Sequence, residues 1–254
     1  MQTSAALKPD YGNWVPKKFI FIPGIFCLIF LGLAFLAPFW AIMSGLFLLI
    51  CGYFLLSYYC FSPAGGDVQA RIVGLVLDRL NWDGKGKALD IGCGNGALTL
   101  RLAQAYPAAR ITGSDFWGKN WDYSQQVCEQ NARIAGVADR TIFQKASASA
   151  LPFEDGSFDL VVSNLTFHEV SHTSDKRQVL REALRMVRPG GKFAFQDLFL
   201  VEAIYGKPEE LVSQVRNWGI HKVEFVKTCD EAFIPTLLKL PFMVGRMGIL
   251  YGER

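Results

Sequence analysis

The sequence carries no charged side chain from Phe19 to Gly66, in a chain of 254 residues. This absence excludes an ordinary water-facing segment. A single straight helix of that length would measure roughly 72 Å, more than twice the hydrocarbon core of a bilayer, which is about 30 Å thick. The stretch is therefore expected to fold back on itself near Pro38.

Cysteine pairs with the spacing of a metal or disulfide site are also lacking. None of the six cysteines forms a C-x-x-C pair, and three of them lie in the uncharged stretch. This excludes a disulfide framework, and no metal site is expected. Lys and Arg exceed Asp and Glu by only 26 to 23 and never cluster beyond pairs, so no nucleic-acid partner is expected.

The uncharged stretch is long enough for two membrane spans. Residues 19–37 and 40–61 would measure roughly 28 and 33 Å as helices, and each length can cross a bilayer. A cleaved signal peptide is disfavoured, because a second apolar span follows the first directly. A hairpin buried inside a water-soluble protein is disfavoured too, because the chain offers too little other surface to cover it. The lipid bilayer is therefore an expected partner.

Basic residues predict how the hairpin is oriented. Lys8, Lys17 and Lys18 precede it, Arg71 and Arg79 follow it, and the turn carries no charge. The positive-inside rule then places both ends of the chain in the cytoplasm. We expect four parts: a cytoplasmic N-terminal segment (1–18), the transmembrane hairpin (19–61), an amphipathic connector (62–86) and a folded domain (87–254).

Strand-like and helix-like segments alternate in the last part of the chain. The pattern predicts helices over 96–106, 121–136, 175–191 and 209–219, the third of them ending at Pro189-Gly-Gly. Strands are predicted at KALDI, ARITGSDF, RTIFQKA, FDLVVSNLT, GKFAFQDLFL, HKVEFVKT and GRMGILYGER. Such alternation is typical of an α/β fold with a mostly parallel, seven-stranded sheet and helices on both faces.

A glycine-rich loop follows the first predicted strand. Gly92, Gly94 and Gly96 would fit a dinucleotide fingerprint, but Asp90 stands directly before them. A carboxylate there would repel a pyrophosphate and would suit a ligand that carries positive charge. S-adenosylmethionine (SAM) carries an ammonium and a sulfonium and no phosphate. Asp115, at the end of the second strand, suits the hydroxyls of a ribose and is compatible with both ligands.

The stretch LDIGCGNG resembles the first motif of class I SAM-dependent methyltransferases, an acid followed by G-x-G-x-G. The similarity continues through SDF, through NARIAGVADRTIFQKASASALPFEDGSFDLVVSNLTFHEV, and through LREALRMVRPGG, over about residues 87 to 200. The resemblance implies a Rossmann-like fold, SAM as the cofactor and methyl transfer as the activity of residues 87–254.

The resemblance also implies where the cofactor binds. Asp90, Gly92 and Gly94 would line its methionine end, Asp115 would bind the ribose hydroxyls, and Phe116 would lie against the adenine. Ser147 stands where the family often has an aspartate for the adenine amino group. The full set of expected cofactor-binding residues is Asp90, Gly92, Cys93, Gly94, Asp115, Phe116, Ser147, Ala148 and Asn164. Trp117 and Trp121, in the loop after the second strand, would either cover the cofactor or simply anchor that loop.

His168 is the candidate general base, with Glu169 beside it, in the loop that faces the acceptor in this family. A purely structural role, in which both residues hold the loop by hydrogen bonds, is an equally open interpretation. Adjacent side chains point in different directions, so the two residues are not expected to act as a dyad. His172 is a further candidate. Asn164 begins Asn-Leu-Thr-Phe rather than N-P-P-[FY], which disfavours an enzyme that methylates amino groups of nucleic acids or proteins.

The segment AFIPTLLKLPFMVGRMGILYG is strongly apolar between Pro235 and Pro241. It is either a core crossover before the last strand or an apolar flap over a lipophilic acceptor. We therefore expect a membrane-anchored methyltransferase that acts on a lipophilic acceptor, such as a quinone-type ring or a lipid head group, or on a small soluble molecule. Two alternatives remain: a SAM-binding membrane sensor or scaffold without turnover, and a membrane-bound nicotinamide-dependent reductase.

Overall fold

The computed structural model describes residues 7–118 and 123–254. Within them the chain divides into two compact units, and each is described by itself. One unit is Asn13–Arg71, called the hairpin unit below. The other combines the segment that ends at Gly12 with Ile72–Arg254 and is called the α/β unit.

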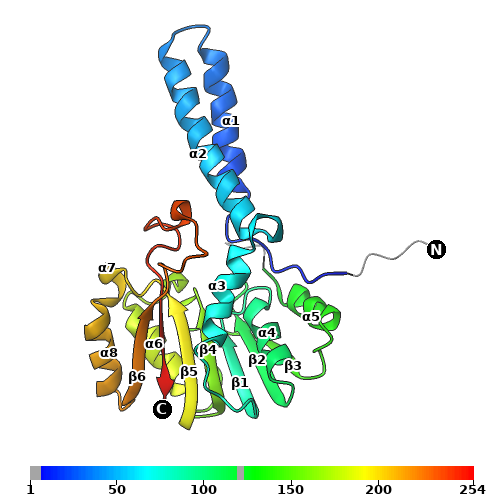
Figure 1. The fold of residues 1–254 in the computed structure, drawn as a ribbon, viewed down its shortest axis with the longest axis vertical. Coiled ribbons are helices and arrows are strands. Elements are labelled where there is room, and N and C mark those ends of the chain that lie inside the picture. The colour runs from blue at the N-terminus through cyan, green and yellow to red at the C-terminus, as the bar shows by residue number, and fades with distance from the viewer. Residues whose placement is uncertain (1–6, 119–122) are drawn as a thin grey trace, which may run out of the picture. The chain divides into compact units, whose positions relative to one another are not determined.

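The hairpin unit is built on two antiparallel helices, α1 (Lys18–Leu33) and α2 (Phe39–Phe61) (Figure 1). Aromatic rings join them: Phe30 stacks on Trp40 with ring centroids 5.4 Å apart, and Phe26 meets Phe47 at 5.2 Å. A short 3-10 turn, η1 (Pro63–Gly65), and helix α3 (Val68–Leu77) follow.

Helix α2, with 23 residues, is the one helix in the described chain that is long and apolar enough to cross a membrane by itself. Helix α1 has 16 residues and ends at Leu33, not at Ala37 as expected. The reason is local, because the residue before Pro38 is sterically biased away from helical backbone and the chain already turns over residues 34–37. The connector is likewise helical only over α3.

The α/β unit contains the expected seven-stranded, mostly parallel sheet. Its strands are β1 (Gly86–Ile91), β2 (Ala109–Asp115), β3 (Thr141–Lys145), β4 (Phe158–Asn164), β5 (Val187–Asp197), β6 (Lys222–Lys227) and β7 (Gly248–Glu253). Their order in the sheet is β3-β2-β1-β4-β5-β7-β6, and only β7 is antiparallel to its neighbours. Because Asp90 pairs with Gly113 on one side and Val162 on the other, the carboxyl ends of β1, β2 and β4 lie level with one another.

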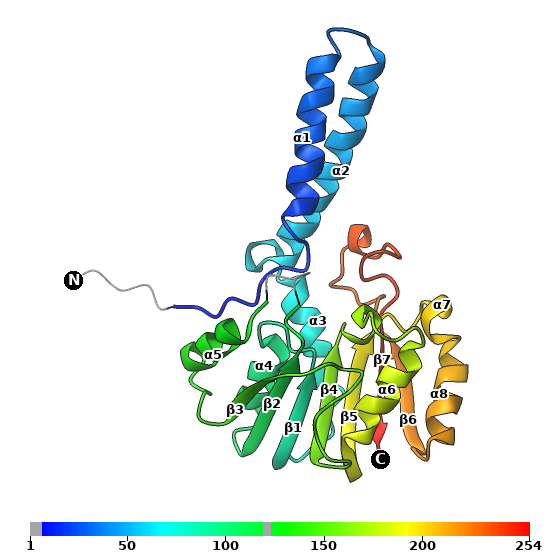
Figure 2. The ribbon, with the colours of Figure 1, turned by 180° about the vertical axis from the view of Figure 1, so that it is seen from behind.

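Helices cover both faces of the sheet. They are α4 (Ala97–Ala105), α5 (Gln125–Ile134), α6 (Lys176–Arg185), α7 (Glu202–Tyr205) and α8 (Pro208–Asn217). Helices α3 and α4 lie in front of the strands in Figure 1, and α6 lies in front of them in the reverse view of Figure 2. Helix α6 ends at Arg185 rather than at Pro189-Gly-Gly, because Val187 already pairs with Phe158 as the first residue of β5.

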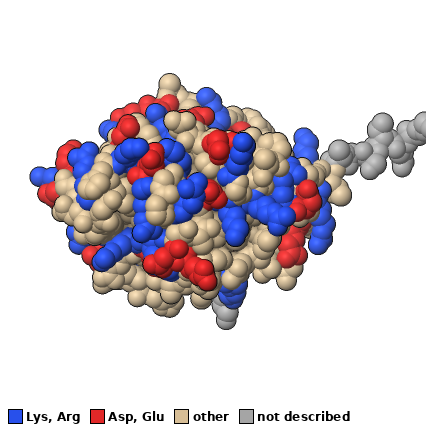
Figure 3. All heavy atoms as spheres, turned by 90° about the horizontal axis from the view of Figure 1, so that it is seen from below, with Lys and Arg blue, Asp and Glu red and all other residues tan. Residues whose placement is uncertain are grey.

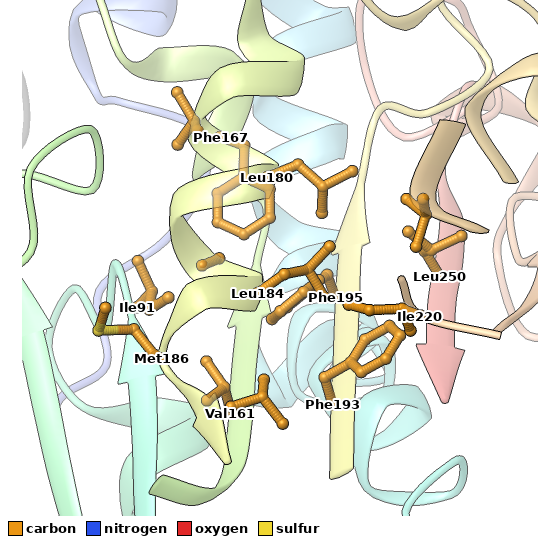
Figure 4. Packing of buried hydrophobic residues seen from close by; sticks show 14 of the residues in the cluster. Ile91, Val161, Phe167, Leu180, Leu184, Met186, Phe193, Phe195, Ile220 and Leu250 are labelled. Atoms are coloured by element: carbon orange, nitrogen blue, oxygen red, sulfur yellow. The ribbon is translucent and has the colours of Figure 1, made fainter. Parts of the chain in front are cut away.

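The core between the sheet and α6 is aromatic and aliphatic. Phe167, Phe193 and Phe195 are fully buried with Leu180 and Leu184, and their side chains point toward one another in Figure 4. The ring centroids of Phe193 and Phe195 are 5.3 Å apart, as are those of Phe167 and Phe195. On the surface that Figure 3 shows, Lys and Arg are interspersed with Asp and Glu, as on most water-facing surfaces.

Candidate active site

The glycine loop between β1 and α4 needs glycine for two reasons. Gly92, Gly94 and Gly96 have φ values of +74°, +56° and +86°, which side chains other than glycine rarely adopt. A Cβ on Gly92 would also lie 2.0 Å from Oγ1 of Thr166, which follows β4. The amide of Gly92 donates to the carbonyl of Ser114 at 2.7 Å and so ties the loop to β2. These contacts fix the backbone of the glycine loop at the carboxyl edge of the sheet.

Asp90 lies beneath this loop and is almost completely buried. Its Oδ2 accepts a hydrogen bond of 2.6 Å from the Thr99 hydroxyl on α4. Burial raises the pKa of the Asp90 carboxyl to about 7; the Thr99 bond opposes the shift and the nearby Asp115 charge adds to it. A positively charged ligand next to this carboxyl would favour its ionised form.

Asp115, at the end of β2, holds two backbone amides. Its Oδ2 accepts from the Gly94 amide at 2.9 Å and its Oδ1 from the Trp117 amide at 2.8 Å. Burial raises its pKa, and these amide hydrogen bonds partly offset the effect. The Trp117 indole donates to the Gly94 carbonyl at 2.9 Å, which supports the anchoring interpretation for this residue. Trp121 lies outside the described residues.

Phe116 follows Asp115 and is 53% exposed, so its ring is open to a ligand. The Lys145 ammonium lies 5.4 Å from the centre of this ring, and the His172 ring meets its edge at 6.3 Å. His172 therefore stands with the expected adenine-binding residue, on a different part of the site from His168.

The remaining expected cofactor residues follow β1, β3 and β4. Cys93 is buried in the glycine loop, and burial together with the neighbouring Cys128 raises the pKa of its thiol. The Ser147 hydroxyl lies 2.9 Å from the Ser149 hydroxyl, and Ala148 packs on the core. At the end of β4, Oδ1 of Asn164 accepts from Gln196 at 2.9 Å. The fold thus brings the expected cofactor residues to one edge of the sheet.

His168 lies in a 3-10 turn, η2 (Phe167–Glu169), between two carboxylates. Its Nδ1 lies 2.7 Å from Oδ1 of Asp197 and its Nε2 lies 3.4 Å from Oε1 of Glu169. The expectation that His168 and Glu169 diverge is therefore wrong: Asp197 fixes one ring nitrogen, and the other then faces Glu169.

The charge state of this group follows from the same contacts. Burial disfavours a charged His168, but the Asp197 and Glu169 carboxylates outweigh it and raise its pKa to about 10. The hydrogen bond from His168 lowers the pKa of Glu169. At neutral pH, His168 is therefore an imidazolium that donates hydrogen bonds, and Glu169 is the unprotonated member that can accept a proton.

Asp197 is a candidate site residue that the sequence reasoning missed. It is fully buried at the end of β5, where it also accepts from the amides of Phe167 at 2.7 Å and Leu198 at 2.6 Å. The predicted fifth strand, GKFAFQDLFL, ran past Asp197 to Leu200, so the sequence pattern did not mark this residue as a strand end; in the structure β5 ends at Asp197. Ligands of open α/β sheets bind at this edge.

Comparison with known proteins agrees with this geometry. Residues 89–195 match a family model described as a methyltransferase domain. The 27-O-demethylrifamycin SV methyltransferase of Amycolatopsis mediterranei (strain S699) is 39% identical over 135 residues, which are 52% of this chain and 46% of the relative. The chain spans about half the length of the curated relatives it matches.

Solved structures share the fold. A geranyl diphosphate methyltransferase in complex with SAM superposes with a TM-score of 0.56 at 15% identity, covering 74% of this chain and 86% of that one. The [4+2]-cyclase SpnF has a TM-score of 0.53 at 22% identity, with 74% and 81% covered. Because a cyclase shares the fold, the architecture alone does not define the chemistry.

The family match covers residues 89–195, and the acid before the glycine loop lies within them. These residues of the α/β unit form a SAM-dependent methyltransferase domain on a Rossmann-like sheet. Its cofactor is S-adenosylmethionine. The roles of Asp90 and Asp115 in holding that molecule stay predictions; the structure places both carboxylates at the glycine loop.

Proposed function

We propose that the protein is a membrane-anchored SAM-dependent methyltransferase, with its catalytic domain in the cytoplasm and a lipophilic methyl acceptor. In this proposal residues 1–18 are an N-terminal segment, 19–61 a transmembrane hairpin, 62–86 a connector and 87–254 the catalytic domain. The single observation that carries the membrane part is the apolar outer surface of the hairpin unit.

That surface has the opposite polarity to a water-facing one. Along α1 and α2 the exposed side chains are large and apolar, and Leu49 is 73% exposed. Ser44 and Ser57 are buried instead, and their hydroxyls donate to helix carbonyls, Ser44 to Cys27 at 3.0 Å and Ser57 to Tyr53 at 2.8 Å. A segment in lipid must satisfy its polar groups internally in this way.

Chain connectivity supports two crossings rather than one. Residues 7–12, before the hairpin, and Ile72–Arg254, after it, belong to the same compact unit. Both ends of the hairpin must then lie on the same side of the membrane. Helix α1 spans roughly 24 Å, and a short span of this kind is accommodated by local thinning of the bilayer.

Methyl transfer needs a bound donor and an oriented acceptor more than it needs covalent chemistry from the protein. SAM supplies an electrophilic methyl group on a sulfonium. The glycine loop and Asp115 would hold it, with Asp90 favouring its positive charge. His168, fixed by Asp197, would orient the acceptor as a hydrogen-bond donor, and Glu169 would accept a proton from an acceptor that must lose one.

The connection between β6 and β7 supports a lipophilic acceptor. Its residues Ile234, Leu238 and Val244 are buried, so part of the segment is core, but Phe242 is 67% exposed. Strand β6 runs in the same direction as β5, since both are antiparallel to β7, and this connection therefore starts at the carboxyl edge of the sheet.

A cavity of about 380 Å³ opens beside this connection, lined by Leu200, Val201, Glu202, Pro241 and Arg246. Leu200 follows Asp197, which bonds to His168, by three residues. The lining of the cavity combines apolar side chains with one charge of each sign. Such a lining suits an acceptor with an apolar body and a polar head.

A labelling experiment tests the proposal. Membranes that contain the protein are incubated with methyl-labelled SAM and separated into lipid extract, soluble fraction and protein, with Asp115→Ala as the control. We expect label in the lipid extract that the control lacks. Label in the soluble fraction alone would favour a small-molecule acceptor, as in the relative named for 27-O-demethylrifamycin SV. SAM binding without any label would favour a sensor.

A further inference from the structure

The short segment before the hairpin is part of the α/β unit. The amide of Asp10 donates to Oδ1 of Asn131 on α5 at 2.9 Å, and Nδ2 of Asn131 donates to the Asp10 carbonyl at 2.8 Å. Tyr11 is half-buried, and the charge of Arg101 on α4 acts on its phenol. Residues 8–12, called the strap below, are thus held by a reciprocal pair of hydrogen bonds.

The same Asn131 side chain also holds the glycine loop. Its Nδ2 donates a second hydrogen bond, of 3.0 Å, to the carbonyl of Asn95 between Gly94 and Gly96. Asn131 and Asn95 are both buried, so neither group can turn to water instead. Both hydrogens of one amide are therefore used, one on the strap and one on the cofactor loop.

A second contact joins the strap to the loop through Tyr123. A Cβ on Gly12 would lie 3.1 Å from Cε1 of the Tyr123 ring, and a Cβ on Gly94 would lie 3.5 Å from Cδ2 and Cε2 at its other edge. Gly12 has a φ of +70°, and its amide donates to Oδ1 of Asp10 at 2.9 Å. The ring stands between the strap and the glycine loop.

We propose that the strap is a positioning element of the cofactor site: residues 8–12, through Asn131 and Tyr123, hold the glycine loop in the shape that binds SAM. The inference rests on the proposed function, because it takes SAM as the ligand of that loop. The strap leads directly into the hairpin unit, which begins at the next residue, Asn13. Removing the hairpin together with everything before it removes part of the cofactor site.

The test compares two glycines with similar positive φ angles, Gly12 and Gly136, in the full-length protein in detergent micelles. Gly12→Ala forces a methyl group toward Tyr123. Gly136→Ala is the matched control, since Gly136 has a φ of +68° and a Cβ there meets nothing within 4 Å. We expect both variants to lower the melting temperature alike, because both place alanine in left-handed backbone. Only Gly12→Ala should weaken SAM binding, by about fivefold or more in titration calorimetry.

Asn131→Ala provides a second, independent variant. It removes all three hydrogen bonds of the shared amide, one of them to the glycine loop, and should weaken SAM binding by about tenfold, the scale of one lost buried hydrogen bond. If Gly12→Ala and Asn131→Ala bind SAM as tightly as the wild type and Gly136→Ala, the inference is overturned and the proposed function stands. If the wild-type protein binds no SAM, the proposed function fails and the inference with it.

Discussion

The hairpin unit and the α/β unit bury opposite kinds of side chain. In the α/β unit, Leu100 and Leu160 are fully buried and charged residues cover the surface. In the hairpin unit, Leu49 is exposed and Ser57 is fully buried. Each unit buries the groups that its surroundings would solvate poorly, and the inversion is what the proposed membrane anchor predicts: water around the α/β unit and lipid around the hairpin unit.

The two units also differ in what their buried polar groups do. In the hairpin unit, the hydroxyls of the buried Ser44 and Ser57 each donate to a helix carbonyl. In the α/β unit, buried carboxylates gather at one edge of the sheet, as Asp90, Asp115 and Asp197. Burying a carboxylate is costly, and groups that bear such a cost are concentrated at functional sites.

The largest difference between the two units is expected when a glycine is replaced by alanine and SAM binding is measured. Gly92→Ala would place a Cβ 2.0 Å from Thr166, whereas Gly45→Ala, in α2, meets nothing within 4 Å. We expect Gly92→Ala to weaken SAM binding on the order of 100-fold, about 2.7 kcal/mol, and Gly45→Ala to leave it within twofold. Titration calorimetry of both variants measures this. Normal SAM binding by Gly92→Ala would show that the glycine loop is not the cofactor site.

An added charge tests the two surroundings directly. Leu49→Lys and Ile142→Lys, on β3, both alter strongly exposed side chains, with exposures of 73% and 62%. A lysine near the centre of a span costs about 2.5–3.5 kcal/mol, while an exposed change in water is worth about 0.5 kcal/mol or less. Flotation of membranes should show Leu49→Lys released or degraded and Ile142→Lys retained. Equal retention of both would argue against a lipid-facing α2.

A pH series tests the ion pair between His168 and Asp197. The pKa of His168 is about 10 in the folded protein, above the ordinary value near 6.5. Stability from this pair is therefore complete below about pH 6.5 and is lost as the pH rises toward 10. Asp197→Asn removes the buried carboxylate, so its stability should depend less on pH.

Melting temperatures at pH 6 and pH 10 measure this difference. The gap between wild type and Asp197→Asn should shrink by about 4–8 °C at pH 10, which corresponds to about 2 kcal/mol. A gap that stays constant with pH would mean that the imidazole is neutral in the folded protein. His168 would then regain its role as the candidate base.

The smallest difference between the two units is expected for the loss in stability when a single hydroxyl group is removed. Thr99→Val removes the hydroxyl that donates to Asp90. The buried carboxyl then lacks this donor, which lowers the free energy of unfolding by about 1–3 kcal/mol. Ser44→Ala removes a hydrogen bond inside the hairpin, where such bonds are worth about 0.6 kcal/mol on average. Melting curves of the two variants should therefore separate clearly. A larger loss for Ser44→Ala would reverse the assignment of the two surroundings.

Local pattern predicted most of the fold. Alternating apolar segments gave the strands, and once the strands are parallel, Asp90, Asp115 and Asn164 must meet at one edge. The exact ends of helices were less predictable, because α6 stops where β5 begins to pair and α1 stops before a proline. These ends depend on pairing and turn geometry rather than on helical periodicity.

Contacts between distant segments could not be predicted from local pattern. The pairing of His168 with Asp197 depends on how the loop after β4 packs beside β5. The strap meets Asn131 across 121 positions of sequence, and no periodicity reports such a contact. In each contact one partner lies in a loop or turn, where the side-chain environment is set by the assembled sheet and not by the neighbouring residues.

The strap places a constraint on biosynthesis. Asp10 leaves the ribosome 121 residues before Asn131, its partner. At roughly 5–20 residues per second, the nascent chain waits roughly 6–24 s between the two, and the hairpin emerges during that interval. If the hairpin is the membrane anchor proposed above, its insertion into the bilayer can therefore be finished before the strap can bind Asn131. The protein would then be anchored in the membrane before it can bind SAM.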